Sequence, residues 1–397
     1  MTRSRLSPRL LILLLLATLL PACRQTSAPV GQGQNENGVA ANAANSAPPG
    51  LSAAGGANAS GVISFFRGVI GEKSRVQMRL VRDGDQLNGA YSYVKVGTEL
   101  SLKGSVDRAG NLTLQEFDAS GAQTGLFKGK WKEDADLAGV RLEGDWSKPN
   151  GDKKSPFSLT EQHIKFTGDV HFADKLISQH DDKRKYSIEA AYPQLAGSQS
   201  ANAEKFNREV AALVSKSVAD WKKDAGAEPG EDDDNSEMVI NEDSLDIDYE
   251  VELANNDLIS LIFSISDFPR GAAHGSYSGE VVNYDLKTGR SLKLSDLFQP
   301  RANYLKTLSD YCIRDLKAQN NKQKPDERML DDEGIEGGAG PEENNYNLWN
   351  ITEKGLLITF GVYQVGPFAA GQQEVMIPYA SLKGILRPDG PTAPFVK

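Results

Sequence analysis

The segment that decides the fold reads Arg270-Gly-Ala-Ala-His-Gly-Ser-Tyr-Ser-Gly-Glu-Val-Val-Asn-Tyr-Asp-Leu-Lys-Thr-Gly-Arg-Ser-Leu-Lys-Leu-Ser-Asp-Leu-Phe298. It opens as a Gly-rich loop, and from Gly279 to Leu286 its residues alternate as they do in a strand with one buried face. Residues 287–290 have turn composition, with Gly289 free to take a positive φ, so Ser291 to Leu294 is predicted to return as the partner strand. Ser295 and Asp296 then predict the cap of a helix.

The chain around this hairpin predicts an α+β domain, residues 161–397, in which an antiparallel sheet is packed by two helices. Apolar residues recur at helical spacing from Ala201 to Lys223 and from Arg301 to Gln319, and the second helix places Cys312 in the core as a small hydrophobe. Two acidic loops are expected, at 226–243 and 324–345. Residues 163–184 are polar and predict no element. Further strands are expected at 186–195, 244–254, 257–267, 346–351, 355–362 and 374–379, with a short helix at 380–385.

Residues 61–160 predict a separate all-β meander, most simply closed as a small up-and-down barrel. The expected strands are 62–69, 74–82, 86–93, 98–105, 111–117, 123–131, 138–147 and 155–160. Trp131 and Trp146 fit either a ligand-binding mouth or the barrel core, and the core is the more usual place for such residues. A barrel lipoprotein that binds a small ligand therefore stays an alternative.

The N-terminus has the composition of a bacterial lipoprotein signal. Basic residues precede an apolar run from Leu10 to Leu20, which is short for a membrane span, and Pro-Ala-Cys23 follows. This predicts a signal peptide over 1–23, lipidation of Cys23, and a protein held in the cell envelope through its N-terminal lipid. A plain secretory signal and a short membrane anchor are the alternatives. Arg24 differs from the aspartate of inner-membrane retention signals, which favours the outer membrane in a Gram-negative source.

Residues 24–60 are rich in Ala, Asn, Gly and Ser and predict a disordered tether. The net charge of −10 and the sequence pI of about 5.1 argue against a nucleic-acid partner. The chain has two cysteines, so Cys312 is left without a disulfide partner once Cys23 carries lipid.

Several motifs of the second domain resemble the paired RsiV-like domain of bacterial envelope proteins, over about residues 180–388. The motifs, each given with the number of its first residue, are Tyr192-Pro-Gln-Leu, Gly271-Ala-Ala-His-Gly, Asn283-Tyr-Asp-Leu-Lys-Thr-Gly, Leu294-Ser-Asp-Leu-Phe, Gly355-Leu-Leu-Ile-Thr-Phe, Tyr363-Gln-Val-Gly-Pro-Phe and Val375-Met-Ile-Pro-Tyr. In that family the domain forms the outer part of lysozyme-binding anti-sigma factors and accompanies PdaC-type peptidoglycan deacetylases. We expect this chain to differ from those proteins in having no membrane helix with a sigma-binding segment and no deacetylase domain, so the resemblance implies an extracytoplasmic recognition module.

No motif predicts catalysis, a cofactor or a metal. Gly275 to Gly279 imitates a nucleophile elbow, but Tyr277 stands where the serine is required. His163, His171 and His180 are too widely spaced for a zinc site, and the acidic run from Glu231 to Asp234 lacks the turn glycine and terminal Glu of a calcium loop.

The sequence therefore predicts a non-enzymatic recognition module, with His274, Tyr277, Tyr363 and Phe368 as candidate binding residues. Gly and Pro beside aromatic side chains are typical of rigid, approachable binding loops. For His274, a structural role as a hydrogen-bonding residue that fixes its own loop is favoured over direct contact with a ligand. The resemblance implies lysozyme-type enzymes as the first expected partner, and the two acidic loops fit such a partner because they attract cationic proteins. Peptidoglycan is the alternative partner.

Overall fold

The computed structural model describes residues 62–72, 74–134, 139–167, 170–225, 242–272 and 274–396. These residues all lie within one compact unit that spans Pro49–Lys397. The predicted signal peptide, Cys23, the tether and the acidic run at 231–234 lie outside the described residues.

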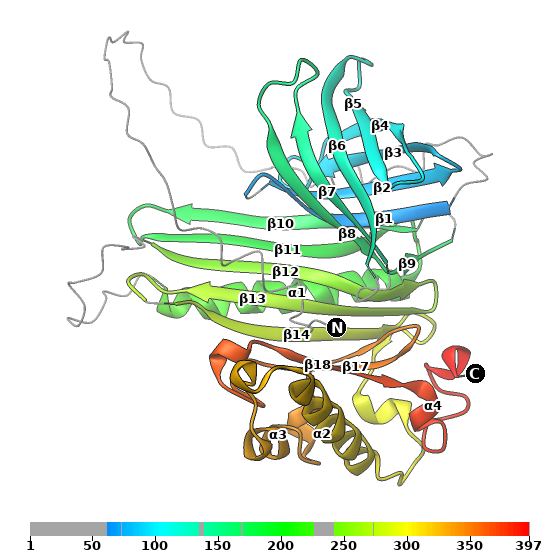
Figure 1. The fold of residues 1–397 in the computed structure, drawn as a ribbon, viewed down its shortest axis with the longest axis vertical. Helices are drawn as coiled ribbons and strands as arrows, with labels where there is room; N and C mark the ends of the chain where they lie inside the picture. The colour runs from blue at the N-terminus through cyan, green and yellow to red at the C-terminus, as the bar shows by residue number, and fades with distance from the viewer. Residues whose placement is uncertain are drawn as a thin grey trace. The chain divides into compact units, whose positions relative to one another are not determined.

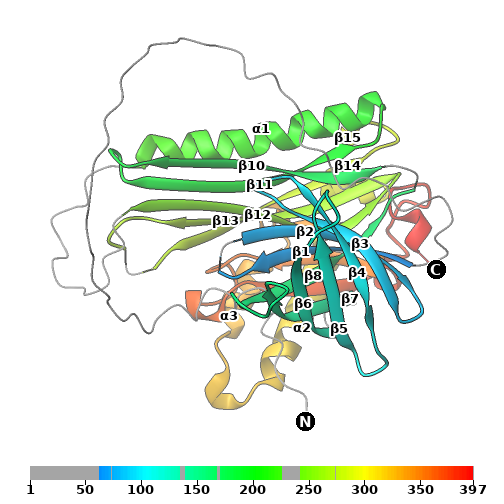
Figure 2. The same ribbon diagram turned by 90° about the horizontal axis from the view of Figure 1, so that it is seen from above.

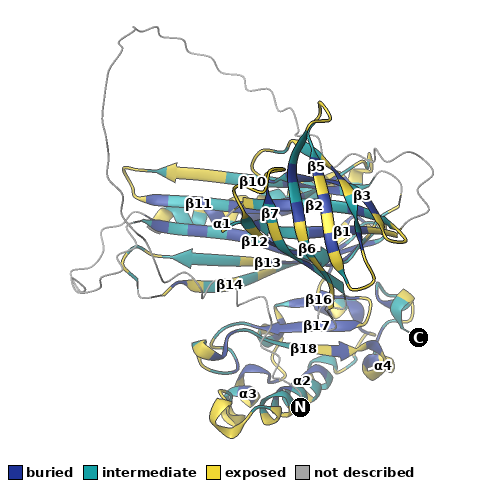
Figure 3. Ribbon diagram, turned by 45° about the horizontal axis from the view of Figure 1, so that its top comes forward, coloured by how far each residue is buried: buried dark blue, intermediate teal, exposed yellow. Residues whose placement is uncertain are grey.

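The first eight strands form a closed antiparallel barrel in which each strand pairs with the next and β1 also pairs with β8 (Figure 1). This confirms the predicted meander barrel. Buried and exposed positions alternate along its strands (Figure 3), because successive side chains of a strand point to opposite faces. The strands are β1 Val62–Ile70, β2 Ser74–Asp83, β3 Gln86–Tyr93, β4 Glu99–Val106, β5 Asn111–Phe117, β6 Gln123–Asp134, β7 Gly139–Ser147 and β8 Ser155–Gln162.

Side chains fill the barrel interior. Tyr91, Phe127 and Leu80 are among its fully buried residues. Glu116 is also buried there, and its carboxylate accepts hydrogen bonds from the Tyr91 hydroxyl at 2.6 Å and the Trp146 indole N–H at 2.7 Å. Both Trp146 and Trp131 pack on the barrel core, the role that the sequence favoured for them.

The second domain is built on a large mixed sheet in the order β10-β11-β12-β13-β14-β15, with β9 paired to β12. Helix α1 (Ala201–Asp224), capped by Ser200, lies along one face of this sheet (Figure 2) and packs on it with Phe206, Val210 and Val214. Strands β11 and β12 run parallel because α1 connects them. The strands are β9 Ile164–Lys165, β10 His171–Asp181, β11 Tyr186–Ala196, β12 Asp243–Asn255, β13 Leu258–Phe268, β14 Ser276–Asp285 and β15 Arg290–Ser291.

A smaller three-stranded sheet follows in the order β16-β17-β18. Its strands are β16 Trp349–Ile351, β17 Gly355–Phe360 and β18 Gln373–Pro378. Helix α2 (Tyr304–Lys322) buries Cys312 and Leu316 against it. The short helices are η2 Leu294–Leu297, η3 Pro325–Glu327, α3 Asp332–Gly338, η4 Glu343–Tyr346, η5 Phe368–Ala370, α4 Tyr379–Leu382 and η6 Ala393–Phe395.

The fold class is as predicted, a barrel followed by a sheet-rich α+β domain, but several local predictions were wrong. Ser295 and Asp296, predicted as a helix cap, lie inside η2, whose N-cap residue is Lys293. Residues 171–181 form strand β10, although its exposed end is too polar for a clear strand pattern. Only Arg290–Ser291 pairs with β14, because the chain turns into η2 at Leu294. Residues 332–338 form helix α3 within a segment predicted as loop, capped by Asp331 and held by buried Ile335.

Buried hydrogen bonds join the two sheets. The Asn350 amide donates to the Ser260 hydroxyl at 2.9 Å and to the Leu261 carbonyl at 3.0 Å. The Asn283 amide donates to the Trp349 carbonyl at 2.7 Å. These side chains are almost fully buried, so the bonds fix how β16 meets β13 and β14.

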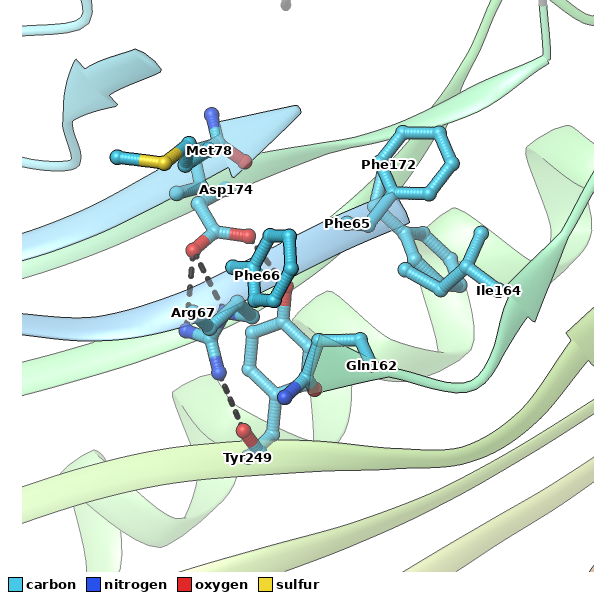
Figure 4. Close-up of a pocket in the computed structure, with 10 residues that line it drawn as sticks. Phe65, Phe66, Arg67, Met78, Gln162, Ile164, Phe172, Asp174 and Tyr249 are labelled. Carbon is cyan, nitrogen blue, oxygen red and sulfur yellow. Dashed lines mark hydrogen bonds and ion pairs between the residues drawn. The ribbon is translucent and has the colours of Figure 1, made fainter. Parts of the chain in front are cut away.

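Charged side chains join the barrel to the large sheet (Figure 4). Arg67 of β1 contacts Asp174 of β10 at 3.0 Å and Asp248 of β12 at 3.0 Å, and its guanidinium lies 3.7 Å from the centre of the Tyr249 ring. Arg75 of β2 contacts Asp248 at 3.4 Å. The barrel therefore meets the sheet through paired charges. A cavity of about 20 Å³ lies beside Arg67 and Tyr249, with room for about one water molecule.

Within the described ranges, no helix combines the length and the apolar character that crossing a membrane requires.

Candidate functional site

The four candidate binding residues meet at one place, which we call the Phe368 patch: His274, Tyr277, Tyr363 and Phe368. The Phe368 ring is at its centre. It stacks on His274 with 4.7 Å between ring centres, and it lies 5.5 Å from Tyr363 and 6.1 Å from Tyr277. His274 and Tyr363 are exposed, and the other two rings are half-buried. The patch is thus an aromatic surface that a ligand can reach.

Two distant parts of the chain supply the patch. His274 and Tyr277 come from the loop before β14 and from β14 itself, whereas Tyr363 and Phe368 come from the connection between β17 and β18. The buried bonds between the two sheets hold these parts in register, since Asn283 lies on β14 and Asn350 lies on β16, beside β17. The patch therefore depends on contacts that join the two halves of the domain.

Tyr363 is held in a backbone conformation that favours glycine. Its φ is 66°, in the left-handed region, and its side chain is 65% exposed. A non-glycine residue there costs of order 1–3 kcal/mol, so such residues are frequent at binding sites, where surrounding contacts over-determine them. The strain holds an aromatic ring outward that has no packing role in the core.

Gln364 supplies those contacts. Its side-chain amide donates to the Gly338 carbonyl at 3.0 Å and to the Asn345 carbonyl at 2.9 Å, and its side-chain oxygen accepts from the Gly361 N–H at 3.0 Å. The three bonds fasten the Tyr363 turn to the segment that carries α3. Gln364 is a positioning residue that the sequence alone did not single out.

An acidic segment lies against this turn. Residues 331–343 contain six carboxylates and no lysine or arginine: Asp331, Asp332, Glu333, Glu336, Glu342 and Glu343. All six are exposed. Lys317 of α2 contacts Asp332 at 3.3 Å and Glu336 at 2.6 Å. The Gln364 bonds place this segment next to Tyr363, so one border of the patch is strongly negative.

His274 also contacts its own loop. Its Nδ1 lies 3.0 Å from the Gly275 carbonyl oxygen. In the tautomer that donates this bond, Nε2 is left as an acceptor on an exposed ring. The loop-fixing and ligand-binding roles considered for His274 are therefore compatible.

The other reactive groups give no competing site. Cys312 is fully buried, and burial, with a smaller effect of the Asp315 carboxylate, raises the pKa of its thiol far above the ordinary range. Among the side chains that the structure describes, no three His, Cys, Asp or Glu residues are grouped so that they could hold a metal ion. The aromatic patch and its acidic border are the arrangement best suited to recognition.

Known proteins match the second domain in consecutive parts. A family model described as "Deacetylase PdaC" matches residues 179–277, and one described as "Protein of unknown function (DUF3298)" matches residues 295–380. Among curated proteins, the chain is similar to peptidoglycan-N-acetylmuramic acid deacetylase PdaC of Bacillus subtilis (strain 168), with 26% identity over 184 residues. The match covers 46% of this chain and 37% of that protein, so the chain spans little more than a third of its relative.

Two solved structures are also similar. A DUF3298 family member from Bacteroides fragilis is 22% identical, with a TM-score of 0.39, and the match covers 59% of this chain and 99% of that one. A DUF3298 family protein from Pseudomonas aeruginosa is 16% identical, with a TM-score of 0.39, and the match covers 55% of this chain and 93% of that one. The similarity to these two family models lies within the second domain, over residues 179–277 and 295–380.

Proposed function

We propose that this protein is a non-enzymatic recognition module of the cell envelope that binds lysozyme-type enzymes through the Phe368 patch. The proposal places the protein outside the cytoplasm, held to a membrane by lipid on Cys23. It assigns no catalytic residue, and it requires no cofactor.

One observation carries the proposal: an outward-held aromatic residue, Tyr363, stands beside an acidic segment that the same turn anchors. Aromatic side chains at the centre of an interface supply much of its binding energy. Carboxylates at its border speed the approach of a cationic protein, as lysozymes commonly are. The patch and the segment at 331–343 provide both parts.

The test is binding of the full chain to c-type lysozyme at low and moderate salt. Affinity should fall when sodium chloride rises from about 50 to about 300 mM, because exposed charges are screened beyond the Debye length. Replacing Glu333, Glu342 and Glu343 by Gln should mainly slow association.

A control variant matched for charge replaces three exposed barrel carboxylates, with Glu72→Gln, Asp83→Asn and Glu133→Gln. If both triple variants slowed association equally, the effect of the acidic segment would be one of net charge alone and not of its position beside the patch. Absence of lysozyme binding in the unaltered chain would overturn the proposal.

Peptidoglycan is the second candidate ligand, and it is favoured by the name of the Bacillus subtilis relative, which acts on peptidoglycan N-acetylmuramic acid. Retention of the full chain on purified peptidoglycan, with lysozyme washed through, would support this candidate in place of the first.

A further inference from the structure

Strand β14 has a free edge along most of its length. It pairs with β13 from Ser276 to Asp285, whereas β15 pairs with its other side only at Tyr284 and Asp285. Among the described strands, none pairs with the outer side of residues 276–282, and Figure 1 shows β14 at the border of the large sheet. We call residues 276–282 the β14 edge.

One hydrogen bond shows which residues direct their backbone groups outward. The Leu292 N–H, just after β15, donates to the Asn283 carbonyl at 2.7 Å, so Asn283 faces away from β13. Because residues of an antiparallel strand bond alternately to its two sides, Tyr277, Gly279 and Val281 face the same way. Their N–H and C=O groups form a row that a further strand can pair with.

The β14 edge lacks the usual protection against strand pairing. It reads Ser-Tyr-Ser-Gly-Glu-Val-Val, with one charged side chain and neither proline nor lysine. Exposed edges are normally blocked by such residues or covered by other groups. The last strand of the small sheet, β18, is covered in this way, since Gln319 of α2 donates to the Glu374 carbonyl at 2.9 Å and the strand ends at Pro378. At the far border of the large sheet, β10 carries Lys175.

The two sides of the β14 edge differ in chemistry. Val282 packs under α1, so Tyr277 and Val281 point to the opposite side, where Tyr277 belongs to the Phe368 patch. The side chains on the α1 side are polar and exposed: Ser276, Ser278 and Glu280. Lys216 of α1 attracts Glu280, which leaves this side with little net charge. An added strand therefore meets an apolar and aromatic side and a hydroxyl-rich side.

We propose that the β14 edge binds an extended segment of a partner protein as an added antiparallel strand. Main-chain hydrogen bonds to Tyr277, Gly279 and Val281 supply affinity, and alternate side chains supply specificity. The segment is amphipathic, with apolar side chains beside Tyr277 and Val281 and hydroxyl side chains beside Glu280. The distance from residue 277 to residue 281 is about 13 Å along a strand, so about seven residues suffice.

This site goes beyond the proposed function, because it selects a partner by its extended backbone and its alternating side chains. It adjoins the Phe368 patch through Tyr277. It uses neither the acidic segment at 331–343 nor Gln364, and it does not depend on lysozyme being the partner.

The test is titration of the full chain with a fluorescently labelled octapeptide, Lys-Thr-Val-Thr-Phe-Thr-Val-Lys, followed by anisotropy. In antiparallel pairing, opposed residues share a face and bond one another, so the valines and the phenylalanine of the peptide bond the outward groups of β14. N-methylation of these three peptide residues should weaken binding by at least about tenfold, equivalent to about 1.4 kcal/mol.

The matched control peptide carries the three methyl groups on its threonines, whose N–H groups point away from β14. It should bind within about threefold of the unmodified peptide, a difference below about 0.7 kcal/mol. No binding by the unmodified peptide, or equal weakening by both methylated peptides, would overturn the strand site.

Amide exchange places the peptide on the chain. In the free chain, Ser278 and Glu280 are bonded to β13, so their amides should exchange slowly, and those of Tyr277, Gly279 and Val281 should exchange faster. Saturating peptide should slow the second set by about tenfold or more and leave the first set unchanged. Protection elsewhere on the chain would contradict the proposal.

A second copy of the chain is the competing occupant. If the outward amides were already protected in the free chain and sedimentation showed a dimer, the β14 edge would be an interface between copies, and the proposal of a partner segment would be overturned. Because the peptide titration contains no lysozyme, failure of the strand site and failure of lysozyme recognition appear in separate experiments.

Discussion

The guanidinium of Arg67 donates two hydrogen bonds to one carboxylate oxygen of Asp174, from Nε at 3.1 Å and from Nη2 at 3.0 Å. One residue belongs to the barrel and the other to the large sheet. Their side chains are only 11% and 1% exposed. The Tyr249 hydroxyl also donates to Asp174. A buried ion pair of this kind leaves an uncompensated charge when one partner is removed.

Replacing Asp174 by Ala should therefore lower the free energy of unfolding by about 3–5 kcal/mol, because Arg67 would keep its charge with fewer partners. Urea unfolding of the full chain measures the change. Lys132→Ala is the control, since Lys132 pairs with Glu143 on the exposed barrel surface and should cost under about 1 kcal/mol. Similar losses in both variants would contradict the importance of the junction.

Acid should weaken the same junction through Asp248. Burial opposes ionisation of this carboxyl, but Arg67 and Arg75 outweigh burial and hold its pKa below the ordinary value of 3.8. A lowered folded-state pKa stabilises the fold above the unfolded pKa, and that stability is lost as the pH falls through the folded pKa.

The neighbouring Asp246 acts in the opposite direction, because burial raises its pKa despite Arg75. Because Asp248 loses its stabilising charge in acid, Asp248→Asn should remove part of the loss of unfolding free energy measured between about pH 4 and pH 2. If this variant lost as much unfolding free energy in acid as the unaltered chain does, groups other than Asp248 would be responsible for the acid sensitivity.

Two substitutions of Tyr363 separate the effect of its ring on binding from the effect of its backbone strain on stability. Tyr363→Gly removes the ring but accepts the φ of 66°, and relief of the strain should raise the unfolding free energy by about 1 kcal/mol. Tyr363→Ala removes the ring and keeps the strain. Both variants should weaken lysozyme binding by a similar factor; a binding loss confined to Tyr363→Ala would show that the ring is not a contact.

Gln364→Ala should weaken lysozyme binding without removing any side chain of the Phe368 patch. The three bonds of Gln364 fix the turn before Phe368, and loss of preorganisation lowers affinity by raising the ordering cost of binding. Amide exchange at residues 361–366 should accelerate in parallel. Weaker binding with unchanged exchange would instead mean that Gln364 touches the partner directly.

Cys312 should not react with thiol reagents in the folded protein at about pH 8, near the ordinary pKa of a free thiol. Its side chain is fully buried, and burial raises the pKa of the thiol far above the ordinary range, whereas the thiolate is the reactive form. Labelling followed by mass spectrometry should detect modification of Cys312 only after denaturant is added. Rapid labelling of the native chain would contradict its place in the core.

Regular patterns in the sequence predict much of this fold. The barrel strands alternate clearly and end at turn residues, so each was predicted to within a few positions. Strand β10 was missed because its last residues, Ser178 to His180, are all exposed. Helix α3 was missed because a short glycine-containing helix rests on its cap and on one buried residue, Ile335, which makes too few turns for a periodic signal.

The candidate site was also predicted only in part. Loop composition pointed to His274, Tyr277, Tyr363 and Phe368 separately, and the structure brings their rings together. Gln364 could not be identified from the sequence, because its partners Gly338 and Asn345 are contacted through backbone carbonyls that carry no residue signature.

Strand β1 begins at Val62, and Arg67 lies further along the same strand. A pulling force applied at the N-terminal end of β1 would load the pairing of β1 with β2 and β8, and it would also reach Arg67. There it would pass directly into Asp174 and Asp248 of the large sheet. Mechanical tension on β1 would therefore be shared between the barrel and the large sheet.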